Sequence, residues 1–203
     1  SDTFTASINS SDTNISADDS LGEGFFIDTT GEDSGYVDID PSDLTGSGTT
    51  ADPYVITNAS ELQAMEDDLD AHYKLGSDID ASATAQWRSG EGFDPVGIFK
   101  GSLNGYNHTI SGLNGDHDGL FGVIGGSATV RDVYIKNISV HGNSTNAIGG
   151  LAGVAADNVT IINGHVTGNI SGYWVVGGLV GEANGNSTVT DSHSTANVSG
   201  EQY

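Results

Sequence analysis

Three polar residues recur at one position of a repeating pattern and could carry acid–base chemistry. Asp132, Asn163 and Asp191 follow one another at intervals of about 30 residues. Paired carboxylates on one face of a protein can act as acid and base in glycoside hydrolysis. If each interval is one coil of a stack, Asp132 and Asp191 would lie about 9.6 Å apart, which is wide even for an inverting pair. A structural ladder of Asp and Asn at a corner is the simpler expectation, and a glycan-active enzyme is an alternative.

A second group of oxygen ligands could hold a hard cation. Asn114, Asp116 and Asp118 alternate and are followed by Gly119, as at the start of a calcium loop. The match is partial, because the twelfth position is Gly125, where a calcium loop places a bidentate Glu. Otherwise we expect no cofactor and no catalytic residue, apart from Ca²⁺ or other cations held weakly by surface acids. The histidines have neither metal-ligand spacing nor an accompanying nucleophile motif: His72, His108, His117, His141, His165 and His193.

The elements that carry these residues are organised by a Gly-Leu-x-Gly motif. It occurs in DGLFG at 118–122, GGLAG at 149–153 and GGLVG at 177–181. An apolar residue follows each motif at the same offset, and the sequences Asn-Ile-Ser at 137–139, Asn-Ile-Ser at 169–171 and Asn-Val-Ser at 197–199 align further on. A constant interval of about 30 residues is typical of stacked repeats.

The pattern inside each repeat predicts strands. Apolar residues alternate with Ser, Thr or Asn, which is the period-2 signature of a strand with one buried face. Short strands separated by Gly and Asn corners favour an all-β fold, a parallel β-helix (β-solenoid), in which the motif forms a corner and Leu179 points into the core. Antiparallel hairpins in a sandwich are the alternative.

The three Gly-Leu-x-Gly units resemble GLUG repeats, which occur in large cell-surface and secreted proteins of bacteria and archaea. The upstream runs GSGTTADPYVITNASELQAM, HYKLGSDID and FDPVGIFKGSLNGYNHTISGL are similar to the region that commonly precedes such repeats. The resemblance covers residues 46–200. It implies a solenoid with a role in adhesion or surface display, and it implies no catalytic set.

The charge of the chain indicates the environment in which the protein works. The formal net charge is −23, with 28 acidic residues against 5 Lys and Arg, and the acids are spread along the chain. This composition is typical of a halophilic protein, here of archaeal type, whose surface stays hydrated in concentrated salt. Nucleic acid and direct membrane insertion are not expected, because acidic partners would be repelled and no long apolar run is present. The chain has no Cys, and because it begins at Ser1 we expect any export signal to lie outside it.

N-glycosylation motifs indicate an extracellular protein. Asn-x-Ser/Thr is more frequent than chance would give, although the solenoid pattern itself accounts for the three sites in the aligned Asn-Ile-Ser and Asn-Val-Ser segments. We expect N-linked glycans on several of these asparagines: Asn9, Asn14, Asn58, Asn107, Asn137, Asn143, Asn158, Asn169, Asn186 and Asn197.

Three regions are predicted: an N-terminal β-extension at 1–45, the beginning of the solenoid with its cap at 46–118, and GLUG-type repeats at 119–203. Ser60 and Gln63 form a capping box for a short helix that presents one apolar face and covers the first coil. Trp87, Phe93, Ile98 and Phe99 should complete that coil. Segments 25–28 and 36–39 predict a hairpin that packs on the solenoid or on a neighbour.

The N-terminal strand and the other end of the stack suggest self-association. Residues 3–8 alternate strictly, with Phe4, Ala6 and Ile8 on one face, and the segment could be a donor strand. No capping element follows the third repeat, so one subunit could pair with the next in a homopolymer. We therefore expect a structural subunit of a surface filament or layer. A surface adhesin or receptor-binding module, including a viral fibre, is the second hypothesis, with Tyr173 and Trp174 as its exposed aromatic candidates.

Overall fold

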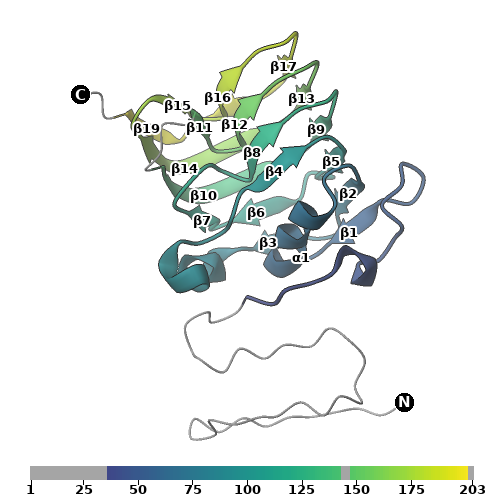
Figure 1. Ribbon diagram of the computed structural model, residues 1–203. Coiled ribbons are helices and arrows are strands. Elements are labelled where there is room, and N and C mark those ends of the chain that lie inside the picture. The colour runs from purple at the N-terminus through teal and green to yellow at the C-terminus, as the bar shows by residue number, and fades with distance from the viewer. Residues whose placement is uncertain (1–35, 143–146, 201–203) are drawn as a thin grey trace, which may run out of the picture.

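A computed structural model describes residues 36–142 and 147–200, and this part of the chain winds into a stack of parallel β-coils. Figure 1 shows the coils following one another from α1 and β1 to β16 and β17 at the opposite end. The predicted parallel β-helix is thereby confirmed.

Four parallel sheets make up the walls. The first has the order β1 (Tyr54–Ile56), β2 (His72–Leu75), β5 (Ser102–Asn104), β9 (Thr129–Arg131), β13 (Thr160–Ile162), β17 (Thr188–Thr190). The second has the order β3 (Ile79–Asp80), β6 (Thr109–Ser111), β10 (Tyr134–His141), β14 (His165–Gly172), β18 (His193–Ser194), with β7 (Asn114–Gly115) also paired to β10 and β19 (Asn197–Gly200) to β14. The third is β4 (Val96–Phe99), β8 (Phe121–Ile124), β12 (Ala152–Ala155) and β16 (Val180–Ala183), and the fourth pairs β11 (Ala147–Gly149) with β15 (Val175–Gly177).

The core consists of columns of apolar side chains, because parallel in-register pairing places equivalent residues of successive coils above one another. Leu103, Val130 and Ile161 are register partners in the first sheet, and all three are fully buried. In the third sheet the rings of Phe99 and Phe121 stack with centroids 4.9 Å apart. Each coil thus buries its inward residues against the coils above and below, as the alternating pattern predicts.

The motif glycines allow the coils to approach closely. A Cβ at Gly119 would lie 2.1 Å from the carbonyl oxygen of Gly150 in the next coil, and one at Gly149 would lie 2.7 Å from the backbone nitrogen of Gly181 in the coil after that. Neither residue has a positive φ. The motif does form a bend in each coil, at residues 119–120, 150–151 and 178–179, as predicted for a corner. What the packing requires there is the absence of a side chain rather than a positive φ.

The left-handed corners are formed by Asp and Asn instead. Asp132, Asn163 and Asp191 have φ values of 56°, 53° and 50° and stand directly after β9, β13 and β17. Asp and Asn tolerate this conformation better than other residues with a side chain, because their short polar groups can bond locally. The recurring Asp/Asn position is a ladder of corner residues, as the simpler reading of the sequence proposed.

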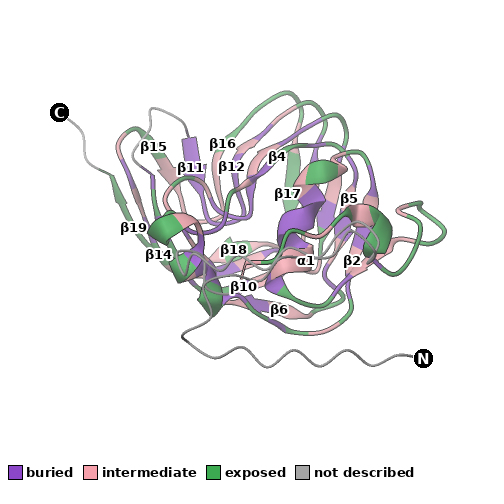
Figure 2. Cartoon of the chain, turned by 60° about the horizontal axis from the view of Figure 1, so that its bottom comes forward, coloured by how far each residue is buried: buried purple, intermediate pink, exposed green. Residues whose placement is uncertain are grey.

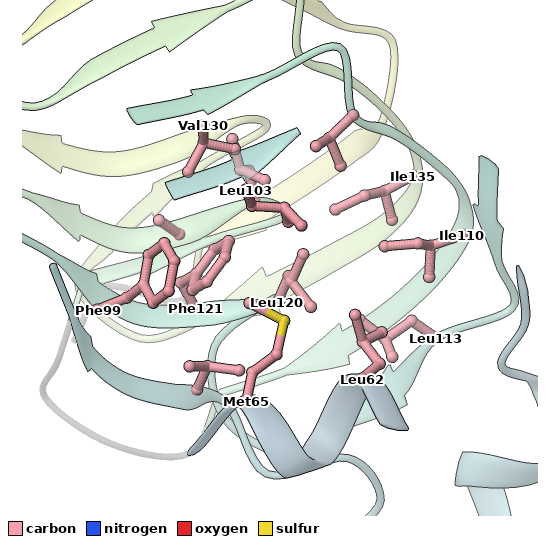
Figure 3. Close-up of a cluster of buried hydrophobic side chains, with 14 of the residues drawn as sticks. Leu62, Met65, Phe99, Leu103, Ile110, Leu113, Leu120, Phe121, Val130 and Ile135 are labelled. Carbon is pink, nitrogen blue, oxygen red and sulfur yellow. The ribbon is translucent and has the colours of Figure 1, made fainter. Parts of the chain in front are cut away.

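A helical cap covers the first coil, but it begins earlier than expected. Helix α1 (Ala59–Gln63) is capped by Asn58, whose Oδ1 accepts a hydrogen bond from the Glu61 N–H at 2.9 Å, so the Ser60–Gln63 capping box is wrong. The 3₁₀ turn η2 (Ala64–Asp67) follows. Figure 3 shows Leu62 and Met65 pointing from this region into the core.

Buried polar contacts attach the cap to the rest of the first coil. The side chain of Gln63 is 1% exposed; its Nε2 donates to the Asp94 carbonyl at 2.8 Å and its Oε1 accepts from the Asp94 N–H at 3.0 Å. The irregular 3₁₀ segment η3 (Ser82–Gly90) contributes Trp87, which is buried. Phe93 and Phe99 are buried as predicted, whereas Ile98 is 56% exposed and takes no part in the core.

The N-terminal boundary of the described region contains no hairpin strand. Residues 36–39 are not in a strand, and a 3₁₀ turn, η1 (Pro41–Asp43), follows them. Tyr36 packs edge-on against Trp87 at a centroid distance of 5.0 Å, so this segment does lie on the cap. The other predicted hairpin strand, 25–28, is outside the described residues. No helix of the described chain is long and apolar enough to cross a bilayer.

Candidate functional site

A column of aromatic side chains stands on the outer face of the second sheet. Tyr134, His165 and His193 are register partners at the start of β10, β14 and β18. The Tyr134 and His165 rings lie 4.6 Å apart, and the His165 and His193 rings 4.1 Å apart. We call these three residues the outer column.

The outer column is bonded to the Asp/Asn corner. The Nδ2 group of Asn163 donates to Oδ1 of Asp132 at 2.8 Å and to the hydroxyl of Tyr134 at 3.2 Å. The Tyr134 hydroxyl donates to Oδ1 of Asn107 at 3.0 Å. Two carboxylates are therefore not placed as an acid–base pair here, because the amide of Asn163 lies between the corners that carry Asp132 and Asp191.

His165 connects the corner with the last described rung. Its Nε2 bonds Oδ1 of Asn163 at 2.7 Å, and its Nδ1 lies 2.7 Å from Nδ1 of His193. Burial lowers the pKa of His165, and a charge on His193 lowers it further. The neutral imidazole is thus the favoured form of His165.

A shallow pocket of about 370 Å³ lies over the outer column, lined by Tyr134, Ile135, Lys136, His165, Thr167 and His193. Histidine spacing along the chain does not indicate this group, because 28 residues separate His165 from His193. The signal was nonetheless present. His165 and His193 stand at the same offset from their Gly-Leu-x-Gly motifs, as Tyr134 does from its own.

The calcium-loop candidates Asn114, Asp116 and Asp118 lie in and directly after β7. Asn114 lies in β7, where its carbonyl accepts from the N–H of Phe93, and the N–H of Asp116 donates to the Glu91 carbonyl. No group of three His, Asp or Glu side chains in the described residues is placed to hold a metal ion. Asp118 is half-buried beside Gly153, and this burial raises the pKa of its carboxyl to about 6. The calcium site stays a prediction.

Every glycosylation candidate in the described part of the chain is exposed, namely Asn58, Asn107, Asn137, Asn158, Asn169, Asn186 and Asn197. Asn169 and Asn197 are register partners and bond through their amides at 3.0 Å. The partner of Asn169 on the other side is Ser139, not Asn137, so the sequence alignment of Asn137 with these two is wrong. Asn9, Asn14 and Asn143 lie outside the described residues.

The end of the stack opposite the cap exposes apolar residues. Val175, Val189 and Val198 are 44%, 42% and 45% exposed, and they belong to the fourth, first and second sheets, respectively, in the last described coil. Figure 2 shows the exposed colour along β17 and β19. Trp174, beside Val175, is 71% exposed, so it does not pack in the core. The donor-strand residues Phe4, Ala6 and Ile8 lie outside the described part of the chain.

The fold, the repeated motif and the acidic exterior define a solenoid repeat protein. Residues 172–199 match the family described as the GLUG motif, which confirms the repeat assignment. Residues 52–168, more than half of the chain, match the family described as the M26 IgA1-specific metallo-endopeptidase N-terminal region, and the chain belongs to that family.

Two relatives are similar to a large part of this chain. The chain is 36% identical over 148 residues to "Halomucin" of Haloquadratum walsbyi, covering 64% of this chain and 2% of the relative. It is 33% identical over 132 residues to a "Putative Gly-rich membrane protein" of Evansella cellulosilytica, covering 57% of this chain and 15% of the relative. The chain therefore spans a small part of each relative. It is a GLUG-repeat surface protein of the haloarchaeal type.

Among solved structures, a putative immunoglobulin A1 protease from Bacteroides ovatus is similar, with 22% identity and a TM-score of 0.45, over 76% of this chain and 69% of that one. The family description likewise names a peptidase. Neither finding assigns an enzyme activity to this chain.

Proposed function

We propose that this protein is an extracellular structural subunit of a halophilic archaeon, which associates with copies of itself into a surface filament or layer and has no catalytic role. In the proposed contact, the alternating segment 3–8 of one subunit adds a strand to the exposed end of the next. Phe4, Ala6 and Ile8 then cover the apolar residues of the last coil. A head-to-tail contact of this kind extends into a fibre when its rotation does not close a ring.

The observation that carries the proposal is the difference between the two ends of the stack. At one end α1 and η2 cover the core, and Leu62 and Met65 are fully buried. At the other end, nothing within the described residues covers Val175, Val189 or Val198. Strand edges with unpaired backbone groups and adjacent apolar surface are association sites.

The net negative charge of the chain favours a contact between copies that is made by backbone hydrogen bonds. With a net charge of −23, copies of the chain repel one another in dilute salt, and this repulsion is screened in concentrated salt. Backbone hydrogen bonds and apolar contacts do not depend on opposite charges. A donated strand therefore gives affinity under the conditions in which an acidic surface is stable.

The test uses the full chain and three variants in concentrated salt, with sedimentation and electron microscopy as readouts. Deleting residues 1–10 should abolish polymers and leave a monomer with unchanged circular dichroism. Replacing Phe4, Ala6 and Ile8 together by Asp should do the same. The matched control replaces the outward residues Thr3, Thr5 and Ser7 by Asp, and it should still polymerise.

Three results would contradict the proposal. Polymers that survive the deletion would exclude the N-terminal segment as the donor. A destabilised monomer after the deletion would indicate that the segment folds back on its own solenoid. A native chain that stays monomeric under all salt conditions would exclude self-association.

Adhesion is the second candidate function, and the exposure of Trp174 favours it. An exposed aromatic ring beside an apolar surface is a common recognition element. Replacing Trp174 by Ser should then reduce attachment of the protein to cells or to immobilised glycans without affecting polymer formation. Equal attachment by both forms would remove this candidate.

N-linked glycans are proposed on the exposed asparagines. Mass spectrometry of material from the native host should find sugar at Asn107, whose side chain is at a corner, and at several of Asn9, Asn14 and Asn143. Bare asparagine at all four would leave solenoid geometry as the sole reason for the frequent motif.

A further inference from the structure

We propose that His165 and His193 form a binding site for a divalent transition metal ion that accepts square-planar nitrogen ligands, Cu²⁺ or Ni²⁺. The two side chains stand on neighbouring rungs, at the starts of β14 and β18, and their Nδ1 atoms face each other at 2.7 Å. Imidazole nitrogen is a preferred ligand of these ions.

The hydrogen bonds around His165 fix which of its nitrogens can bind a metal. The carboxylate of Asp132 can only accept, so the amide NH₂ of Asn163 faces it at 2.8 Å and the amide oxygen points to His165. An amide oxygen also only accepts, and Nε2 of His165 must therefore carry the proton. Its Nδ1 is left with a free lone pair, directed at His193.

This arrangement is the one in which histidine usually binds metal. A metal-ligating His commonly donates its other ring N–H to an oxygen atom, which sets the tautomer and the ring orientation. Here the Asp132–Asn163 pair supplies that oxygen and is itself anchored by the Tyr134 hydroxyl at 3.2 Å. Only one proton can lie between the two Nδ1 atoms, and His193 provides it. The metal ion takes the place of this proton, which moves to Nε2 of His193.

The separation of the two nitrogens selects the geometry of the ion. With metal–nitrogen bonds of about 2.05 Å, adjacent ligands at a right angle are about 2.9 Å apart, and tetrahedral ligands about 3.3 Å. The observed 2.7 Å lies closer to the right-angled pair. His193 is exposed, so its ring can turn toward an ion at the pocket. Water completes the coordination.

The charged groups near the histidine pair have opposite effects on the binding of a cation. Asp132 and Asp191 stand in the corner column beside the pair and favour a cation, whereas Lys136 lines the same pocket and opposes it. The overall charge of −23 raises the local concentration of cations around the protein. The site therefore depends on the two imidazoles for its selectivity.

The test is a Cu²⁺ titration of the untagged full chain near neutral pH, followed by calorimetry and by electron paramagnetic resonance. The native protein should bind one Cu²⁺ with a two-nitrogen hyperfine pattern, and both imidazoles should remain neutral with their protons on Nε2. His193→Gln and His165→Gln should each lose this signal. The matched control is His141→Gln: His141 is an exposed strand residue bonded to Ser171 with no histidine partner, and its loss should leave binding unchanged.

A further variant tests the role of Asn163 as a positioning residue. Asn163→Gly tolerates the left-handed corner and removes the amide oxygen. It should weaken Cu²⁺ binding about tenfold or more, and nitrogen NMR should change from the Nε2–H tautomer of His165 to a mixture. Equal Cu²⁺ affinity of the native chain and His193→Gln would overturn the proposal, as would equal loss in His141→Gln.

Discussion

Asp118 should destabilise the fold at neutral pH. Its carboxyl lies against the backbone of Gly153, where a Cβ would be 2.9 Å from its Cγ, and no hydrogen bond to this carboxyl is found among the described residues. Burial raises its pKa from 3.8 to about 6, and the nearby His117 opposes this shift. Because the folded state holds the proton more tightly than the unfolded state, the folded state is favoured by protonation of Asp118.

The sign and size of the effect follow from this shift. The contribution of Asp118 to stability is fully present below about pH 4 and is lost as the pH rises through about 6. Two pKa units correspond to about 3 kcal/mol as an upper limit. The side chain is partly exposed, and screening by solvent reduces this to about 1 kcal/mol.

The perturbation is Asp118→Asn, which keeps the size of the side chain and cannot ionise. Urea unfolding at one fixed high salt concentration should give a free energy of unfolding about 1 kcal/mol above the native chain at pH 8, and no difference at pH 3.5. The control is Asp70→Asn, which removes one exposed charge far from Gly153. A difference between Asp118→Asn and the native chain that does not vary with pH would refute the reasoning, as would equal gains from both variants.

Three further predictions concern the stack. Leu151→Ala should lower the free energy of unfolding by about 2–5 kcal/mol, and Leu179→Ala should lower it by clearly less. The reason is that Leu151 is 1% exposed whereas Leu179 is only partly buried, and thermal unfolding of the two variants tests the difference. Gly119→Ala should destabilise by at least about 1–3 kcal/mol because its Cβ meets the Gly150 carbonyl, whereas Gly125→Ala, with its nearest neighbour at 3.8 Å, should be tolerated; urea midpoints test this. Transfer to about 0.1 M salt should unfold the chain or dissociate its assemblies, since acidic groups within about 10 Å of one another then repel with little screening; circular dichroism and sedimentation would detect it, and unchanged structure would remove the halophile interpretation.

The sequence predicted the coil and its register where the pattern was unbroken. Val130, Ile161 and Val189 were aligned by their offset from the motif, and they are register partners in the structure. The alignment failed at Asn137, because the pairing of β10 with β14 shifts between Ile135 and Ile138. The break is visible in the sequence, because two polar residues, Lys136 and Asn137, separate the buried Ile135 and Ile138, but it does not show how the two strands realign after it.

The outer column was missed for a different reason. His165 and His193 are 28 residues apart, and their contact exists because two coils have nearly equal length. Spacing rules for metal ligands apply along a helix or strand, whereas here the neighbours lie across strands. The tautomer of His165 depends in turn on Asp132, which lies another coil away. A search along the aligned repeats, column by column, would have found the group.

The one-sided cap also has a kinetic consequence. Each coil contacts mainly its two neighbours, so ordering can spread from coil to coil, and it is favoured to begin where α1, η2 and the buried Gln63 already fix the first turn. Unwinding then starts from β17 and β19, whose residues are all exposed, while β2 and β5 are the last to open. Amide hydrogens should accordingly exchange in a gradient along the stack, fastest at the exposed end. Folding is thus expected to proceed from the capped end of the stack to the exposed end, and unfolding in the reverse order.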